Sequence, residues 1–159
     1  MHRHTSLWYN ESMNKDLTLA RTTLAAKKLT LCIAQNGEIV ARDTAHGVVP
    51  LARLCLHGQI GAYKNAALAD RITGRAAAIL LASLGISAVH TGVLSQAAVP
   101  VLQAADIDFS YDIMAEGIKN RVGDALCPME ALAAPLGIGD ADKLLQGIQT
   151  FFEKQGVII

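Results

Sequence analysis

Residues 70–84 read DRITGRAAAILLASL, and this is the most informative segment of the sequence. From residue 76 to residue 84, every side chain except Ser83 belongs to alanine, isoleucine or leucine. A helix that is apolar on every face is buried on all sides. We therefore expect a helix over residues 70–84 that lies in the middle of the domain, against a sheet.

A hairpin is expected before this helix. Residues 29–34 and 38–41 are rich in β-forming side chains, and Asn36-Gly37 between them is a strong signal for a two-residue hairpin turn. After the helix, residues 86–91 and 107–113 are the expected strands; in the second, apolar and polar side chains alternate.

The remaining helices are expected from their apolar spacing and their capping residues. They start at Asn14, at Val48, at Ser95, at Cys127-Pro128, and at Asp140 or Asp142. An antiparallel hairpin joined to parallel crossovers predicts an α/β fold. We expect three layers, α/β/α, around a mixed sheet with an antiparallel N-terminal hairpin and parallel strands.

Length and composition favour one packed domain. The chain has 159 residues, 52% of them hydrophobic, and this length suits a single core. We expect a flexible N-terminal extension over residues 1–13, with Met1 or Met13 as the true start, and one domain over residues 14–159. Lys+Arg and Asp+Glu number 14 each, so the basic excess typical of nucleic-acid binding is missing and no nucleic-acid partner is expected.

The cellular compartment is predicted from what the sequence lacks. Cys32, Cys55 and Cys127 are odd in number and widely spaced, which indicates no disulfide framework. The N-terminus has no charged start followed by an apolar core, as a secretory leader would have. No apolar stretch is long enough to span a bilayer. We therefore expect a cytoplasmic protein without a membrane partner.

Three short segments resemble a known family in their order and spacing, over about residues 17–136. The similarity is to an uncharacterised domain-of-unknown-function family of the cytidine-deaminase-like superfamily. It implies a cytidine-deaminase-like fold. The segments are residues 70–78 (DRITGRAAA), Thr91-Gly92 followed by Ser95-Gln96-Ala97, and Asn120-Arg121 followed by residues 127–130 (CPME).

The zinc ligands of the deaminases are absent from this sequence. Deaminases place His-x-Glu or Cys-x-Glu at the start of a buried helix and Pro-Cys-x-x-Cys at the start of the next. Here the corresponding residues are 73–76 (TGRA) and 94–98 (LSQAA), which contain no histidine, cysteine or glutamate. We expect no metal, no cofactor and no zinc-dependent deamination, because a fold does not carry an activity by itself.

Arg75 is the main candidate for binding a ligand, because of its place at the start of the buried helix. A positive charge in the first turn of a helix opposes the helix dipole. One explanation is that Arg75 and the helix N-terminus together bind a phosphate or carboxylate, and another is that Arg75 pairs with Asp70. The candidate ligand-binding residues are Thr73, Gly74, Arg75, Thr91, Ser95, Asn120 and Arg121.

Catalytic candidates are Cys127, Glu130 and Asp70. A thiol at a helix N-terminus can act as a nucleophile, but Glu130 nearby would oppose thiolate formation. The same residues also make a complete structural helix start, with Pro128 at the first position. Cys55, His57, Cys127 and His90 could also be considered as metal ligands. Their spacing in the sequence is not the pair of short spacings that is typical of zinc sites, so this site is disfavoured.

Three functions remain open from the sequence. The first is a zinc-free relative of the deaminases that binds a nucleotide or another phosphorylated small molecule. The second is a metal-independent enzyme that uses Cys127 or the carboxylates Asp70 and Glu130 for group transfer. The third is a structural or assembly role, with the high apolar content leaving room for a homo-oligomer.

Overall fold

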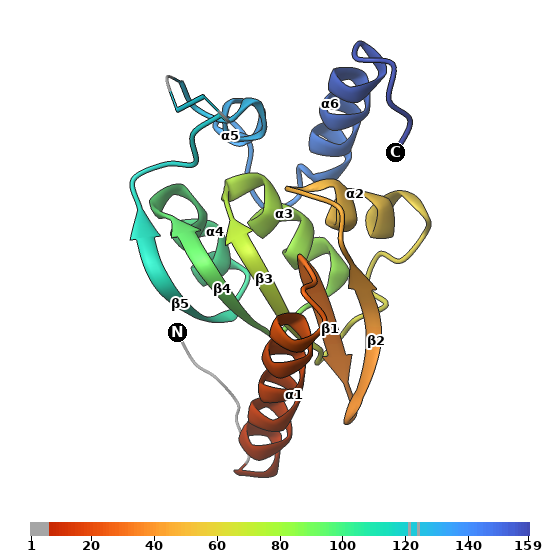
Figure 1. Ribbon diagram of the computed structural model, residues 1–159, viewed down its shortest axis with the longest axis vertical. Coiled ribbons are helices and arrows are strands. Elements are labelled where there is room, and N and C mark those ends of the chain that lie inside the picture. The colour runs from red at the N-terminus through yellow and green to blue at the C-terminus, as the bar shows by residue number, and fades with distance from the viewer. Residues whose placement is uncertain (1–6, 121, 124) are drawn as a thin grey trace.

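The protein forms an open mixed sheet of five strands in the order β2-β1-β3-β4-β5. A computed structural model describes residues 7–120, 122–123 and 125–159 (Figure 1), with side chains from residue 11 onward. β1 is antiparallel to β2 and to β3, whereas β3, β4 and β5 run parallel. The strands are β1 (Leu31–Gln35), β2 (Glu38–Asp43), β3 (Ala67–Thr73), β4 (Ala88–Ser95) and β5 (Asp108–Ala115).

Helices cover both faces of this sheet, as expected. Along β3, Ala67 and Ala69 pack against α1, whereas Leu68 between them belongs to the main core on the opposite face. All the helices other than α1 contribute to that main core, and α5 and α6 lie beyond the carboxyl ends of the parallel strands (Figure 1). The helices are α1 (Leu7–Ala26), α2 (Val49–Leu56), α3 (Arg75–Leu84), η1 (Gln96–Ala98), α4 (Val99–Ala104), α5 (Pro128–Ala133) and α6 (Ala141–Glu153).

α3 is the central helix of the main core. Its residues from Ala76 to Leu81 are all buried, as is Leu84. The helix ends at Gly85, whose φ of 86° is the left-handed conformation that glycine adopts at low cost. The prediction that this helix is buried in the middle of the domain is therefore confirmed.

The prediction of one helix over residues 70–84 was wrong at its start. Asp70 to Thr73 belong to β3, and the helix begins at Arg75. Residues 66–69 read AALA, which favours helix by propensity. Residues 67–69 of β3 are paired on both sides and buried on both faces, so they are all apolar in place of the alternation expected of a half-buried strand.

The first helix also begins earlier than expected. α1 starts at Leu7 rather than at Asn14, so residues 7–13 of the expected extension are helical, and residues 1–6 lie outside the described part. Met13 is buried and packs against Ala67 and Ala88. Packing against the sheet therefore extends the helix past the residue that resembled a cap.

The predicted hairpin turn is confirmed and is held by α1. Asn36 and Gly37 have φ values of 55° and 82°, as a two-residue turn of this kind requires. Both of their backbone N–H groups donate to the buried carboxylate of Asp16, at 3.2 and 2.8 Å. A polar side chain of the helix thus fixes the far end of the hairpin.

Candidate functional site

A cavity of about 200 Å³ lies at the carboxyl end of β3. The end of β3, the first turns of α3, the start of α5 and the loop at residues 46–48 form its walls. Open α/β sheets commonly bind ligands at the carboxyl ends of their strands. Four of the residues singled out in the sequence line this cavity: Asp70, Gly74, Cys127 and Glu130.

Glu130 of α5 caps the N-terminus of α3. Its Oε1 accepts a hydrogen bond from the Arg75 backbone N–H at 2.7 Å, and its Oε2 accepts one from Ser95 Oγ at 2.9 Å. Only 7% of Glu130 is exposed. A negative charge is stabilised at a helix N-terminus. The place where we expected an external anion is therefore taken by a carboxylate of the chain itself.

The Arg75 side chain binds backbone carbonyls of other elements. Its Nε and Nη2 donate to the Leu136 carbonyl at 2.9 and 2.6 Å, and Nε also reaches the Ala133 carbonyl at 3.2 Å. Nη1 donates to the Ala97 carbonyl at 3.0 Å. Carbonyls at a helix C-terminus lack helical partners and carry partial negative charge, and α5 ends at Ala133.

These contacts explain why Arg75 stands where a positive charge opposes the dipole. Its guanidinium lies at the C-terminal end of α5 and not over the N-terminus of its own helix. Glu130 of α5 thus binds the N-terminus of α3, and Arg75 of α3 binds the C-terminal end of α5. This arrangement favours a structural role for Arg75 over the anion-binding role and the pairing with Asp70 that we considered.

Gly74 leaves the room that the Glu130 carboxylate occupies. A Cβ built at Gly74 would overlap Glu130 Oε1, although the φ of −96° would suit any residue. We expect Gly74→Ala to destabilise the fold by about 1–3 kcal/mol, because overpacking displaces the carboxylate from the Arg75 N–H. Urea denaturation measures this loss. Gly137→Ala is the matched control, since nothing lies near that Cβ position; equal small losses in both variants would contradict the prediction.

Asp70 is a buried carboxyl at the wall of the cavity. Its Oδ1 accepts from the Arg71 backbone N–H at 2.8 Å, and its Oδ2 accepts from the Thr73 hydroxyl at 3.0 Å. Burial raises the pKa of Asp70 from 3.8 to about 7, against the lowering effect of these hydrogen bonds. A carboxyl that exchanges its proton near neutral pH can act as an acid or as a base.

Cys127 is half-buried at the N-cap of α5, and its backbone N–H donates to the Ile118 carbonyl at 2.8 Å. The predicted start of the helix at Pro128 is confirmed. The Glu130 carboxylate, three residues further on, is bound to α3 and Ser95. A catalytic role for Cys127 stays a prediction.

The sequence profile of a family described as "Domain of unknown function (DUF1893)" matches residues 19–152. The chain belongs to the DUF1893 family. Its structure is similar to the crystal structure of the DUF1893 protein TM1506 from Thermotoga maritima, with 21% identity, 96% of this chain and 97% of that one covered, and a TM-score of 0.77. This likeness shows a shared fold.

A more distant likeness links this DUF1893 chain to a solved structure described as the NE0047 (N66A) mutant in complex with 8-azaguanine. The identity is 12%, the covered shares are 70% of this chain and 89% of that one, and the TM-score is 0.41. No curated protein matches the chain.

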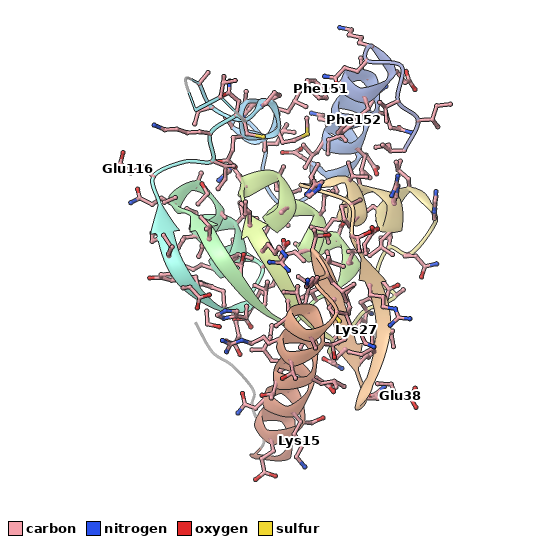
Figure 2. The ribbon with its side chains drawn as sticks, in the orientation of Figure 1. Lys15, Lys27, Glu38, Glu116, Phe151 and Phe152 are labelled. Carbon is pink, nitrogen blue, oxygen red and sulfur yellow. The ribbon has the colours of Figure 1, made fainter. Side chains whose placement is uncertain are left out.

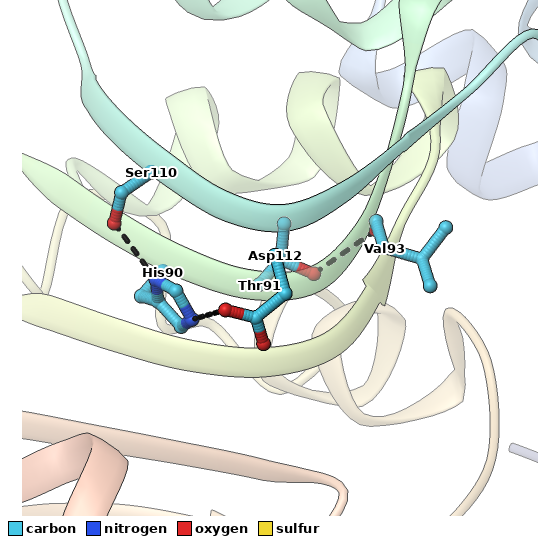
Figure 3. A network of polar contacts seen from close by, with 5 residues as sticks. All are labelled: His90, Thr91, Val93, Ser110 and Asp112. Carbon is cyan, nitrogen blue, oxygen red and sulfur yellow. Dashed lines mark hydrogen bonds and ion pairs between the residues drawn. The ribbon is translucent and has the colours of Figure 1, made fainter.

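The other predicted ligand residues of the DUF1893 chain serve internal contacts or lie elsewhere. Thr91 is fully buried and its hydroxyl donates to the Val93 carbonyl of the same strand at 3.2 Å (Figure 3). The Asn120 side chain accepts from the Gly123 N–H at 2.8 Å and so closes its own loop. Arg121 lies outside the described residues.

Sequence reasoning missed His46, Arg71 and Ile118 as cavity-lining residues. Arg71 was expected in the helix over residues 70–84 but belongs to β3. Within the described residues, no three His, Cys, Asp or Glu side chains come together in a way that could hold a metal ion. No helix in the same part of the chain is both long and apolar enough to cross a membrane.

Proposed function

We propose that the cavity beside Asp70 binds the ring of a nucleobase, as part of a nucleoside or nucleotide. The observation that carries this proposal is the buried Asp70 carboxyl, with a pKa of about 7, at the wall of an otherwise mostly apolar cavity. A protonated carboxyl both donates and accepts hydrogen bonds. It therefore matches a ring edge on which a ring nitrogen accepts beside an amino group that donates.

The walls and the size of the cavity support a flat, apolar-faced ligand. Val48, Ala76, Ala77, Ile118 and Met129 offer apolar contact to the faces of a ring. A volume of about 200 Å³ is below the range of about 300–1,000 Å³ that is usual for drug-sized ligands. One ring system fits this space better than a whole nucleotide.

The sugar and any phosphate would then lie at the rim. Arg71 and His46 line the cavity and are both exposed, so we assign them to this part of the ligand. Arg71 Nε donates to the Leu29 carbonyl at 2.6 Å, so only the other N–H groups of its guanidinium would reach the ligand. Arg75, the phosphate ligand first expected, has its guanidinium on backbone carbonyls. The resemblance of residues 70–78 and 127–130 to the cytidine-deaminase-like superfamily supports the same class of ligand without zinc chemistry.

Calorimetric titration with adenine, cytosine, guanine, uracil and their nucleosides tests the proposal. We expect at least one base and its nucleoside to bind, and Ala77→Leu to abolish binding because the added carbons fill the cavity. The control is Ala82→Leu on the same helix, where the side chain faces a separate cavity near Ile60. Absence of binding at millimolar base, or binding that Ala77→Leu leaves unchanged, would reject the proposal.

A further inference from the structure

His90 of β4 lies between two polar side chains of β5 on the α1 face of the sheet. Its register partner Ala69 packs against α1, which places His90 on that face. His90 Nδ1 is 2.8 Å from Ser110 Oγ, and Nε2 is 3.5 Å from Asp112 Oδ1 (Figure 3). One histidine thus contacts a hydroxyl and a carboxylate through its two nitrogens.

The proton positions follow from the partners. Burial, and after it the nearby Arg21, hold the pKa of His90 below its ordinary 6.5, while Asp112 acts in the opposite direction. A neutral imidazole has one donor and one acceptor nitrogen. The Asp112 carboxylate can only accept, so Nε2 carries the hydrogen and Nδ1 accepts the hydrogen bond from the Ser110 hydroxyl.

A hydroxyl that donates to a histidine held by a carboxylate is the arrangement of an activated nucleophile. Ser110 is exposed, whereas His90 is 8% exposed, so the nucleophile can be reached while its base is held in place. Asp112 has 65% of its side chain exposed, so it orients the imidazole less strongly than a buried carboxylate would.

A cavity of about 280 Å³ opens beside His90 and Asp112, and Ser110 lies next to it, as the register partner of His90 on β5. His90 and Asp112 line it, together with Arg21 of α1 and Arg71 of β3. Gly92 adds no side chain there, and a Cβ at this position would come within 2.8 Å of the Arg71 carbonyl. Guanidinium groups favour a carboxylate or phosphate on a substrate and stabilise an oxyanion that forms near them.

We propose that Ser110 is a nucleophile, with His90 as its base, that hydrolyses carboxylic esters bearing a second, anionic group. Ser110 Oγ attacks the ester carbonyl carbon while its proton passes to His90 Nδ1. The alkoxide leaves with that proton as an alcohol, which gives an acyl-serine. Water then attacks the acyl carbon, gives a proton to His90, and releases the acid while Ser110 regains its proton.

The proposal is separate from base binding beside Asp70. Asp70 and Arg71 line both cavities, but the reacting groups His90, Ser110 and Asp112 belong to β4 and β5. The charged groups near His90 are Asp112 from β5 and Arg21 from α1, and Arg71 of β3 lines the same cavity. Either proposal can fail while the other stands.

Release of nitrophenol from 4-nitrophenyl hemisuccinate, with mass spectrometry of the acylated chain, tests this inference. We expect Ser110→Ala to abolish acylation and His90→Gln to slow it about 100-fold, since general bases contribute roughly 10²–10⁴ in rate. Asp112→Asn should slow it by about tenfold or less, since its side chain is mostly exposed. The wild-type rate should rise with pH and level off by about pH 7, because the pKa of His90 lies below 6.5.

Two controls and one specificity variant complete the experiment. Ser87→Ala and Glu116→Gln should leave the rate unchanged, and Glu116 follows the end of β5 and projects away from the fold (Figure 2). Arg21→Gln should remove a preference of about tenfold for the hemisuccinate over neutral 4-nitrophenyl acetate.

Three outcomes would overturn the inference: a wild-type rate equal to that of imidazole buffer, acylation mapped to another residue, or full activity in Ser110→Ala. Melting temperatures check that every variant folds. Ser110 and Asp112 are exposed, so their variants decide the question even if His90→Gln does not fold.

Discussion

Replacing Glu130 with alanine is expected to lower the free energy of unfolding by about 3 kcal/mol. The carboxylate accepts from the Arg75 N–H and from Ser95 Oγ in a buried setting, and its loss leaves both donors without this partner. An unsatisfied buried donor costs about 1–3 kcal/mol, and loss of a helix cap adds about 1 kcal/mol.

Urea denaturation at pH 7 measures this loss. Glu130→Gln keeps one carbonyl acceptor and should lose about half as much as the alanine variant. Glu116→Ala is the control, because Glu116 directly follows β5 and its side chain is exposed to solvent (Figure 2). If the losses in Glu130→Ala and Glu116→Ala were equal, the carboxylate would not be what docks α5 onto α3.

Asp70→Asn is expected to stabilise the fold above pH 7. The pKa of Asp70 is about 7 in the folded chain against an ordinary 3.8, so the folded state holds this proton through a range where the unfolded chain has lost it. The contribution of Asp70 to the free energy of unfolding is therefore greatest below pH 3.8 and falls as the pH rises to about 7. Between these two pH values, the free energy of unfolding falls by at most about 4 kcal/mol because of this group.

Denaturation curves between pH 4 and pH 8 test this prediction. The stability of the wild type relative to Asp70→Asn should fall across the range, because asparagine does not ionise. Asp142→Asn, an exposed position in the first turn of α6, should differ from the wild type by a nearly constant small amount. If the wild type gained stability relative to Asp70→Asn as the pH rose, Asp70 would be ionised in the folded state at low pH.

A carboxyl that destabilises the fold at neutral pH is typical of a functional site. Asp70 lines the proposed base-binding cavity, and its proton is the property on which that proposal rests. Stability measured with and without a bound base would connect the two. A ligand that binds only the folded chain should offset part of the cost of Asp70.

Local sequence signals predicted several elements correctly. Asn36-Gly37 specified the hairpin because few other dipeptides adopt two successive positive φ angles. Ser95 caps η1 by accepting from the Ala97 N–H, and Pro128 opens α5 at the first helical position. The resemblance to a family of unknown function was confirmed by the DUF1893 match. The hairpin turn and the two helix starts depend on residues that are neighbours in the chain, and the family match depends on short segments in a fixed order along it.

The tertiary structure alone decided the start of α3, the length of α1 and the roles of the charged residues. Residues 67–69 (ALA) look helical in isolation but form a strand because β1 and β4 pair with them on both sides. Arg75 and Glu130 are 55 residues apart, on helices α3 and α5, which meet only in the fold. His90 likewise meets Ser110 through strand pairing. Backbone pairing and burial between distant segments outweigh local propensity, and spacing along one chain does not encode them.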